Sequence, residues 1–145
     1  MVPRVVVVDT PGYGFSVRGK GVAAGWQAKI EGFLKARSPT VLTRTVLLID
    51  ARVGIGDLDR AVIEMLEEAF VPWQVVLTKA DAVAGAELER AALGVATELA
   101  RHQLPFPVLH AVSARSGEGV GDLQRTLIGS AKLLRVGRAP APAAA

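Results

Sequence analysis

Four short, uninterrupted apolar runs rich in β-branched residues most constrain what this chain can fold into. They occupy residues 4–8, 45–49, 74–77 and 108–112. A continuous apolar run, unlike one that alternates with polar residues, indicates a strand that is buried on both faces. The four runs therefore predict the strands of a sheet that is covered on both sides.

Between and after these runs, apolar residues recur every three or four positions, as they do on one face of a helix. The stretches with this period cover residues 26–34, 58–70, 88–99 and 120–134. We expect Pro39 to mark the end of the first helix, Asp57 to cap the second and Gly85 to open the third. The alternation predicts an α/β fold, a doubly wound parallel sheet in which ligands bind beyond the carboxyl ends of the strands.

Composition narrows the class of protein. The 145 residues suffice for one compact domain, and half of them are hydrophobic, which excludes disorder for most of the chain. The absence of cysteine excludes disulfides, thiolate nucleophiles and cysteine metal sites, and it favours a reducing compartment. Residues 1–134 are predicted to form the domain, and the Ala/Pro-rich residues 135–145 a disordered tail.

Neither membrane insertion nor export is expected from the sequence. No apolar run approaches the ~20 residues of a membrane-spanning helix. The apolar stretch at the start of the chain is too short for a signal peptide, and no cleavage region follows it. We therefore expect a soluble protein that is not secreted.

The formal net charge is +3, and basic side chains gather in the first third of the chain. A nucleic-acid partner is one interpretation of this cluster, and an ordinary solvated basic face is the other. A tryptophan in the same stretch could touch RNA, or pack in the core. The candidates for contact with RNA or a partner are Arg18, Lys20, Trp26, Lys29, Lys35 and Arg37.

The first apolar run is followed by Asp9, and Gly12 comes three residues later, in the sequence DTPG. A carboxylate at the tip of a strand can order the water shell of Mg²⁺, and a glycine lets its backbone N–H approach a phosphate closely. The same D-x-x-G pattern is common in ordinary turns. Taken alone, it leaves a magnesium and phosphate site and a plain turn as alternatives.

The third run leads into Thr78, Lys79 and Asp81, in the sequence TKAD. The Asp81 carboxylate can accept two hydrogen bonds from the N1–H and 2-amino groups of guanine, whereas adenine would leave it unpaired. The stem of Lys79 can lie along the purine face while its ammonium stays in water. After the fourth run, backbone N–H groups near Ser113 and Ala114 could meet the guanine carbonyl. The alternative for TKAD is a solvated Lys–Asp pair.

Together these motifs resemble the translation-factor-like GTPases, and most closely the EngB/YihA-type GTPases that assist assembly of the large ribosomal subunit. The resemblance runs from Arg4 to about Leu134 and rests on DTPGYGFSV, WQAKIEGFLKAR, LLIDAR, VPWQVVLTKAD and SARSGEG. The DxPGYG form, the aromatic and basic helix after it, and the threonine before KxD are more specific than the bare GTPase motifs. The family usually has a serine-rich closing loop, where this chain has AVSAR.

The resemblance implies a three-layer P-loop GTPase-type fold with a mainly parallel sheet, GTP or GDP as ligand, and Mg²⁺ as cofactor. The residues that it assigns to the nucleotide phosphates are Asp9, Thr10, Pro11 and Gly12, with Asp9 reaching Mg²⁺ through water. Those that it assigns to guanine are Thr78, Lys79, Asp81, Ser113 and Ala114. No residue is assigned as catalytic, because Tyr13 stands where Ras-like proteins carry a water-orienting glutamine.

The resemblance also implies partners and a location. The protein is expected to be a monomer before it docks on the large ribosomal subunit, where it would contact ribosomal RNA and ribosomal or assembly proteins. A bacterial cytoplasm or a mitochondrial matrix is the expected compartment.

One motif of this fold is missing, because the sequence nowhere contains G-x-x-x-x-G-K-[ST], the loop that cradles the phosphates. We therefore expect the N-terminal strand, this P-loop and the first helix of the fold to be absent from the chain. The missing strand would lie between those predicted at residues 5–8 and 46–49, so its loss would leave two buried edges unpaired. A truncated reading frame, a partner chain that supplies the rest, and a degenerate GTPase are the three explanations.

Two other functions stay open at this point. A catalytically inactive GTPase-like scaffold bound to ribosomal RNA or protein would need no phosphate loop. A phosphoacceptor receiver domain also places aspartates at two strand ends, here Asp9 and Asp50. Such a domain carries its lysine on a later strand than its Ser/Thr, whereas Thr78 and Lys79 are adjacent here, which disfavours it.

Overall fold

The computed structural model describes residues 5–10, 12–13, 22–37 and 42–136. Its elements are α2 (Val22–Arg37), β1 (Thr45–Asp50), α3 (Asp57–Glu68), β2 (Trp73–Thr78), the 3₁₀ helix η1 (Ala80–Ala82), α4 (Gly85–Leu99), β3 (His110–Ala111) and α5 (Val120–Val136). All four predicted helices and three of the four predicted strands are present. The α/β class is confirmed.

The sheet is parallel throughout, in the order β1-β2-β3. β1 and β2 pair along their whole length, from Thr45 opposite Trp73 to Asp50 opposite Thr78. β3 covers only residues 110–111 of the predicted strand 108–112.

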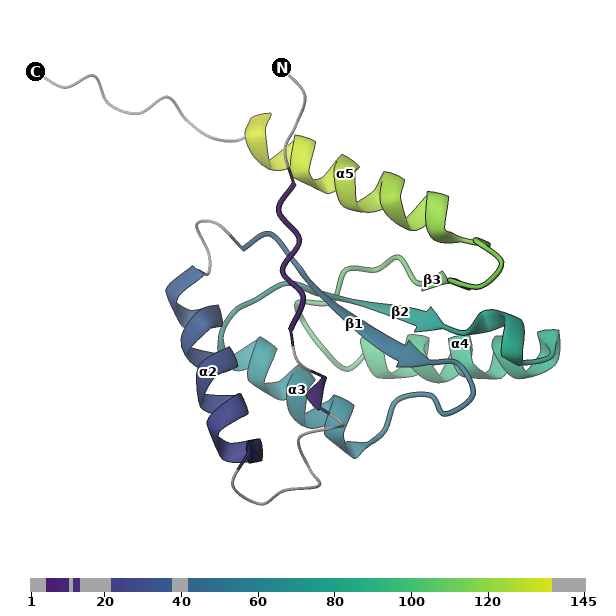
Figure 1. The fold of residues 1–145 in the computed structure, drawn as a ribbon, viewed down its shortest axis with the longest axis horizontal. Helices are drawn as coiled ribbons and strands as arrows, with labels where there is room; N and C mark the ends of the chain where they lie inside the picture. Colours follow the sequence, from purple (N-terminus) through teal and green to yellow (C-terminus); the bar gives the residue numbers. More distant parts are fainter. Residues whose placement is uncertain (1–4, 11, 14–21, 38–41, 137–145) are drawn as a thin grey trace, which may run out of the picture.

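Helices cover both faces of the sheet, with α5 on one side and α2, α3 and α4 on the other (Figure 1). Side chains of a strand alternate between the two faces, and every second residue of β1 and β2 packs with α2, α3 and α4. This core contains the buried residues Leu34, Leu47, Ile49, Ala51, Ile63, Leu66, Val71, Trp73, Val75, Leu77 and Val95. On the α5 side, Gln74 and Val76 of β2 are also fully buried, as a continuous apolar run predicts.

Polar contacts fasten α5 to the sheet. Arg44 donates hydrogen bonds to Gln74 Oε1 at 2.7 Å and to Ser130 Oγ at 2.6 Å, and its guanidinium stacks on the ring of Phe106. Gln74 donates to Val108 O at 2.8 Å. A buried amide therefore has partners for both its oxygen and its nitrogen, as burial of polar atoms requires.

The prediction of a strand at residues 4–8 is wrong for residues 5–8, the part of this range that the structure describes. Residues 5–10 form no strand, and Val6 and Val7 are 85% and 83% exposed. A β-branched run favours an extended backbone, but a strand also needs a hydrogen-bonded neighbour. In the described ranges β1 pairs on one edge alone, with β2, and its Leu48 is 62% exposed. Among the described residues, the N-terminal run does not pair with the other edge of β1.

The helix starts differ in detail from the predictions. Gly56 caps α3, and Asp57, the predicted cap, is the first helical residue. The carboxylate of Asp59 accepts a hydrogen bond from Gly56 N at 2.7 Å, so a side chain inside the first turn satisfies the cap. α4 begins at Gly85, as predicted. Pro39, the predicted end mark of α2, lies outside the described residues.

The C-terminal helix extends to Val136, so it includes the first two residues of the predicted tail. Residues 137–145 lie outside the described ranges. Among the helices that the structure describes, none could cross a membrane.

Candidate functional site

β1 and β2 end side by side, and charged residues gather at these ends. Asp50, the last residue of β1, accepts hydrogen bonds from Arg52 Nε at 2.9 Å and Arg52 Nη2 at 2.6 Å. Its Oδ2 also accepts one from Lys79 Nζ at 2.9 Å. These hydrogen bonds, that of the Arg52 guanidinium above all, hold the pKa of Asp50 well below its ordinary value. The carboxylate is therefore ionised and shared between two cations.

Lys79 follows β2 in the left-handed region, with φ 56° and ψ 38°. The chain turns there, directly after Thr78, whose Oγ1 donates to Ile49 O at 3.2 Å. The turn continues into η1, which carries the exposed Asp81. The TKAD residues therefore stand at the carboxyl end of a buried strand, where ligands bind in folds of this class.

The loop after β3 is hydrogen-bonded to this turn. Ala80 N donates to Val112 O at 3.1 Å, and Val112 N donates to Leu77 O at 2.8 Å. Ser113 is fully buried, and its Oγ accepts a hydrogen bond from Ser116 N at 3.0 Å. Its side chain therefore shapes the loop, while Ala114 beside it is exposed. The residues that these two joined loops carry are Thr78, Lys79, Asp81, Ser113 and Ala114.

Gly119 closes the second loop at a position where a side chain does not fit. Its φ is 72°, and a Cβ at this residue would lie 2.1 Å from Ala111 O. Gly117, two residues earlier, also has a positive φ of 81°, but its Cβ would meet nothing within 4 Å. The close approach at Gly119 is thus specific to the place where the loop passes the end of β3.

The N-terminal motif is built differently. Asp9, Thr10 and Gly12 are exposed and belong to no strand, and Pro11 lies outside the described residues. Tyr13 is half-buried, and its hydroxyl donates to Asp59 Oδ1 at 2.5 Å. Burial, followed by this hydrogen bond, raises the pKa of Tyr13 above its ordinary value. The N-terminal motif is thereby attached to the first turn of α3.

The described residues contain no group of three His, Cys, Asp or Glu that could hold a metal ion. Mg²⁺ keeps several waters and usually takes one or two carboxylates together with substrate phosphates. The exposed carboxylate of Asp9 can supply one such contact through water. The described residues therefore fit Mg²⁺ as a companion of a bound nucleotide, and they do not form a site for the ion by themselves.

Part of the basic cluster lies on α2. Its exposed residues there are Lys29, Lys35 and Arg37. Lys35 forms an ion pair with Glu31, one helical turn earlier. Arg18 and Lys20, and the side chain of Trp26, lie outside what the structure describes. Three of the six predicted RNA or partner candidates are therefore exposed to solvent in the part of the chain that the structure describes.

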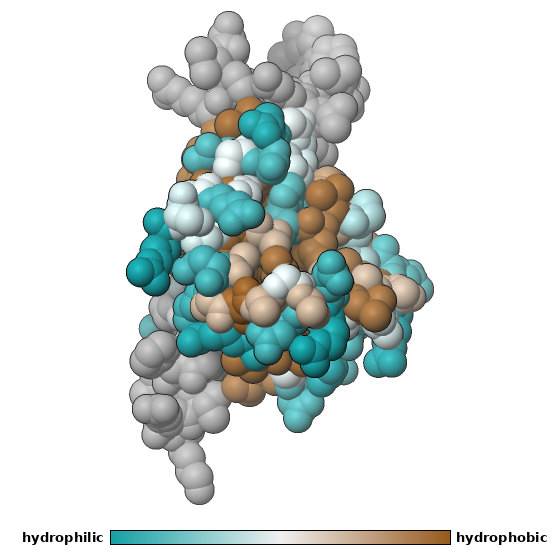
Figure 2. All heavy atoms as spheres, turned by 90° about the vertical axis from the view of Figure 1, so that its right-hand side faces the viewer, coloured by the Kyte–Doolittle hydropathy of each residue, from teal (hydrophilic) through white to brown (hydrophobic). Residues whose placement is uncertain are grey.

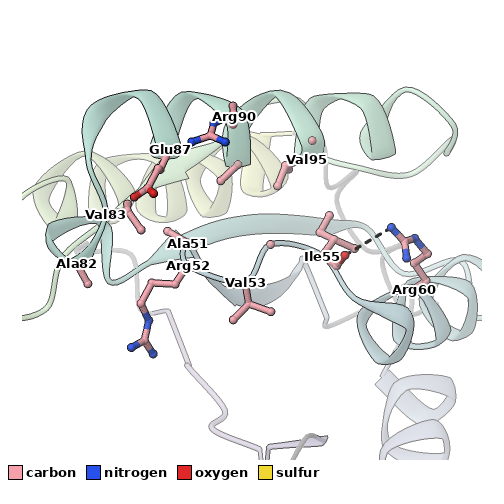
Figure 3. A pocket seen from close by; sticks show the side chains of 13 residues that line it. Ala51, Arg52, Val53, Ile55, Arg60, Ala82, Val83, Glu87, Arg90 and Val95 are labelled. Carbon is pink, nitrogen blue, oxygen red and sulfur yellow. Dashed lines mark hydrogen bonds between the residues drawn. The ribbon is translucent and has the colours of Figure 1, made fainter.

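A cleft that the sequence did not predict lies beside Asp50. It has a volume of about 520 Å³ and runs between the loop after β1 and α4 (Figure 3). Its charged lining residues are Arg52, Arg60, Glu87 and Arg90. Arg52 lines the cleft and also pairs with Asp50.

Figure 2 shows the side of the molecule toward which the β1 and β2 arrows of Figure 1 point. Hydrophilic and hydrophobic residues are interspersed on it. Ligand sites combine apolar surface with a few polar groups. The face at the carboxyl ends of the strands offers both.

No protein-family model matches the chain. Curated proteins do match. The chain is 40% identical, over 122 residues, to the probable GTP-binding protein EngB of Rhodopseudomonas palustris strain HaA2, a match that covers 84% of this chain and 56% of that protein. It is 41% identical, over 123 residues, to the probable GTP-binding protein EngB of Nitrobacter winogradskyi, covering 85% of this chain and 56% of that protein. The chain spans about half the length of the curated relatives it matches.

Solved structures with a similar fold include translation elongation factors. The apo form of SelB from Methanococcus maripaludis superposes with a TM-score of 0.67 at 21% identity, covering 86% of this chain and 24% of SelB. The same factor in complex with the GTP analogue GPPNHP gives a TM-score of 0.61 at 22% identity, covering 71% of this chain and 23% of SelB. At these identities the likeness concerns the fold, and it confirms the predicted GTPase-type architecture.

Sequence and fold agree on one relationship. The 122 matched residues of the Rhodopseudomonas relative span most of this chain. The parallel sheet has the architecture of the translation-factor GTPases. Over the part that it spans, this chain is a homologue of the EngB GTP-binding proteins, with the fold of a P-loop GTPase.

Proposed function

We propose that this chain carries the guanine-recognising part of a GTP-binding protein, a GTPase that assists assembly of the large ribosomal subunit. Its relatives are named GTP-binding proteins. The observation that most supports the proposal is the hydrogen bond from Ala80 N to Val112 O, 3.1 Å long, which holds the TKAD turn against the loop of Ser113. The two loops that would read neighbouring groups on one edge of the base are thus already joined.

Each residue of the two loops has a role in this proposal, and the aliphatic stem of Lys79 would lie along the purine face. Asp81, exposed in η1, would accept hydrogen bonds from the N1–H and 2-amino groups of guanine. Adenine lacks both donors, so it would leave the carboxylate unpaired. The exposed backbone at Ala114 would face the guanine carbonyl. Thr78 and Ser113 would act by shaping the two loops, because their hydroxyl groups already bond to other backbone groups.

The phosphate side of the nucleotide would meet Asp9, Thr10, Pro11 and Gly12. When bound with the nucleotide, Mg²⁺ would neutralise phosphate charge. Asp9 would hold one water of the ion's shell, and Gly12, where a Cβ would meet nothing within 4 Å, would leave room for a phosphate to approach. Tyr13 is bonded to Asp59, so it is not placed to orient water for hydrolysis. No residue of the chain is proposed as catalytic.

The exposed basic residues of α2 would contact ribosomal RNA. Lys29, Lys35 and Arg37 are exposed there, and Arg18, Lys20 and Trp26 precede or begin the same stretch of sequence. Phosphate contacts of lysine and arginine are weakened by salt, which makes binding to RNA testable by its salt dependence. We place the protein, a monomer before docking, in a bacterial cytoplasm or a mitochondrial matrix.

A second function would use the same exposed basic residues. A scaffold with the same fold, bound to ribosomal RNA or protein, would contact its partner through Lys29, Lys35 and Arg37 without turning over a nucleotide. The two proposals differ in whether docking depends on the nucleotide.

Base selectivity tests the first proposal. We expect GDP to bind the chain more tightly than ADP in an NMR titration, which also measures weak affinities. Asp81→Asn should reduce that preference by about tenfold to a hundredfold, because two charge-assisted hydrogen bonds are lost. Asp57→Asn, at an exposed carboxylate on α3, is the matched control and should leave the preference unchanged. Equal binding of GDP and ADP by the unmodified chain would contradict the proposal.

Docking separates the two functions. Sedimentation with large-subunit particles is measured with GDP, with a GTP analogue and with no nucleotide. A GTPase that assists assembly should dock in one nucleotide state, whereas a scaffold should dock equally in all three. Arg37→Glu should weaken docking more than Arg101→Glu, a charge reversal at an exposed residue outside the basic cluster.

A further inference from the structure

The hydrogen bond from Lys79 Nζ to Asp50 Oδ2, called the tether below, is not explained by the roles given so far. Lys79 Nζ lies 2.9 Å from Asp50 Oδ2, although the two residues are 29 positions apart in sequence. They come from neighbouring strands, since Asp50 stands opposite Thr78 in the register of β1 and β2. The lysine side chain therefore crosses from the end of β2 to the end of β1.

Both ends of this tether are fixed. At one end, the backbone of Lys79 is held in the left-handed region, and Ala82 N donates to Lys79 O at 2.9 Å. At the other end, Arg52 grips the Asp50 carboxylate with two guanidinium nitrogens, and its backbone N–H donates to Asp50 Oδ1 at 3.0 Å. A carboxylate that accepts three hydrogen bonds from one neighbouring residue offers the ammonium a defined position.

We propose that Asp50 is a positioning residue for nucleotide binding: it anchors the Lys79 ammonium so that the aliphatic stem is presented to the base in one conformation, and Arg52 holds Asp50 in place. This inference rests on the proposed function of the TKAD turn. An untethered lysine has many rotamers and must be ordered when a ligand packs on its stem, and a tether present before binding removes part of that cost. Asp50 itself need not touch the nucleotide.

The proposal predicts a coupling between Asp50 and Lys79 in ligand affinity. Loss of one preordered side chain corresponds to an affinity about threefold to tenfold weaker. Asp50→Ala should weaken binding of GDP by this factor. Once Lys79 has been replaced by alanine, there is no stem to position, so Asp50→Ala should then have no further effect.

A double-mutant cycle tests this coupling. GDP affinity is measured by NMR titration for the unmodified full chain, Asp50→Ala, Lys79→Ala and the double variant, with Asp57→Ala as the control for loss of a carboxylate. An equal loss from Asp50→Ala with and without Lys79, or no loss at all, would overturn the proposal, because a merely structural role predicts one of these. Asp50→Asn, which keeps the shape and removes the charge, should show a smaller loss with the same dependence on Lys79.

A measurement without nucleotide separates this inference from the function on which it rests. In the free chain, the Lys79 ammonium should give a slowly exchanging ¹⁵N signal that is lost in Asp50→Ala and kept in Asp57→Ala. If that signal is present and GDP binds no better than ADP, the proposed function is wrong, and the nucleotide role of Asp50 falls with it. If GDP is preferred and the signal is absent, the anchor alone is wrong.

Discussion

The two halves of the proposed nucleotide site are built in different ways. The base half, which comprises Thr78, Lys79, Asp81, Ser113 and Ala114, lies on two loops that follow paired strands and are hydrogen-bonded to each other. The phosphate half, residues 9–12, follows a valine run that belongs to no strand. A strand-end motif therefore acquires a defined position only when its strand is docked in the sheet.

The largest effect is expected where the base half is packed most tightly. Gly119→Ala would place a Cβ 2.1 Å from Ala111 O, at a residue whose φ is 72°. Strain and displaced backbone together should destabilise the fold by about 3 kcal/mol or more. Gly117→Ala has the same kind of φ with open space around it, so it should cost about 1 kcal/mol. Urea unfolding of the two variants measures both losses of free energy of unfolding. Equal losses would show that the contact with Ala111 O does not contribute.

A pair of identical substitutions compares the two valine runs. Val75 in β2 is 1% exposed and Val7 is 83% exposed. Val75→Ala removes buried methyl groups and leaves a cavity, so it should lower the free energy of unfolding by about 2 kcal/mol. Val7→Ala should change it by less than about 0.5 kcal/mol. A loss of similar size at Val7 would mean that the N-terminal run is docked after all, and the contrast between the halves would disappear.

The success of the sequence-based predictions also differs between elements that are docked in the sheet and the N-terminal run that is not. The predictions of the helices and of the strands at 45–49 and 74–77 were correct because the apolar residues of each element pack against a neighbouring element. The run at 4–8 has the same composition, but residue pattern alone does not reveal whether a pairing partner is present. Gly56 rather than Asp57 caps α3 because the choice depends on where the carboxylate of Asp59 points. A short-range pattern does not fix that direction.

The site shows the same limit. TKAD and the Ser113 loop were located correctly relative to their strands, since the carboxyl ends of parallel strands share one edge of the sheet. The contact between Asp50 and Lys79 could not be predicted from the sequence, because it depends on the register between two strands. A signal existed in the sequence: an aspartate and an arginine, in LLIDAR, directly follow a buried run.

A smaller effect is expected from the buried hydroxyl in the base half. Ser113→Ala removes the acceptor of the hydrogen bond from Ser116 N, which is 3.0 Å long, at a fully buried side chain. The N–H left without this partner should lower the free energy of unfolding by about 1 kcal/mol. Ser116→Ala, at an exposed hydroxyl that accepts from Glu118 N at 3.3 Å, should cost less. The reverse order in urea unfolding would mean that the loop is held from its exposed side.

The smallest effect is expected at the contact that attaches the phosphate half to α3. Tyr13→Phe removes the hydrogen bond to Asp59 and should lower the free energy of unfolding by about 1 kcal/mol or less at neutral pH, because the side chain is only half-buried.

The pKa of Tyr13 is raised in the folded chain, so the folded state keeps the phenolic proton that the unfolded state releases near pH 10. Stability from this contact is therefore complete below pH 10 and falls as the pH rises toward the folded pKa, and Tyr13→Phe should lack that part of the decline. Tyr13 is the single tyrosine of the chain, so the absorbance of tyrosinate reports its ionisation directly. A midpoint at the ordinary value near 10 would show that the phosphate half is not attached to α3, and it would widen the contrast with the base half.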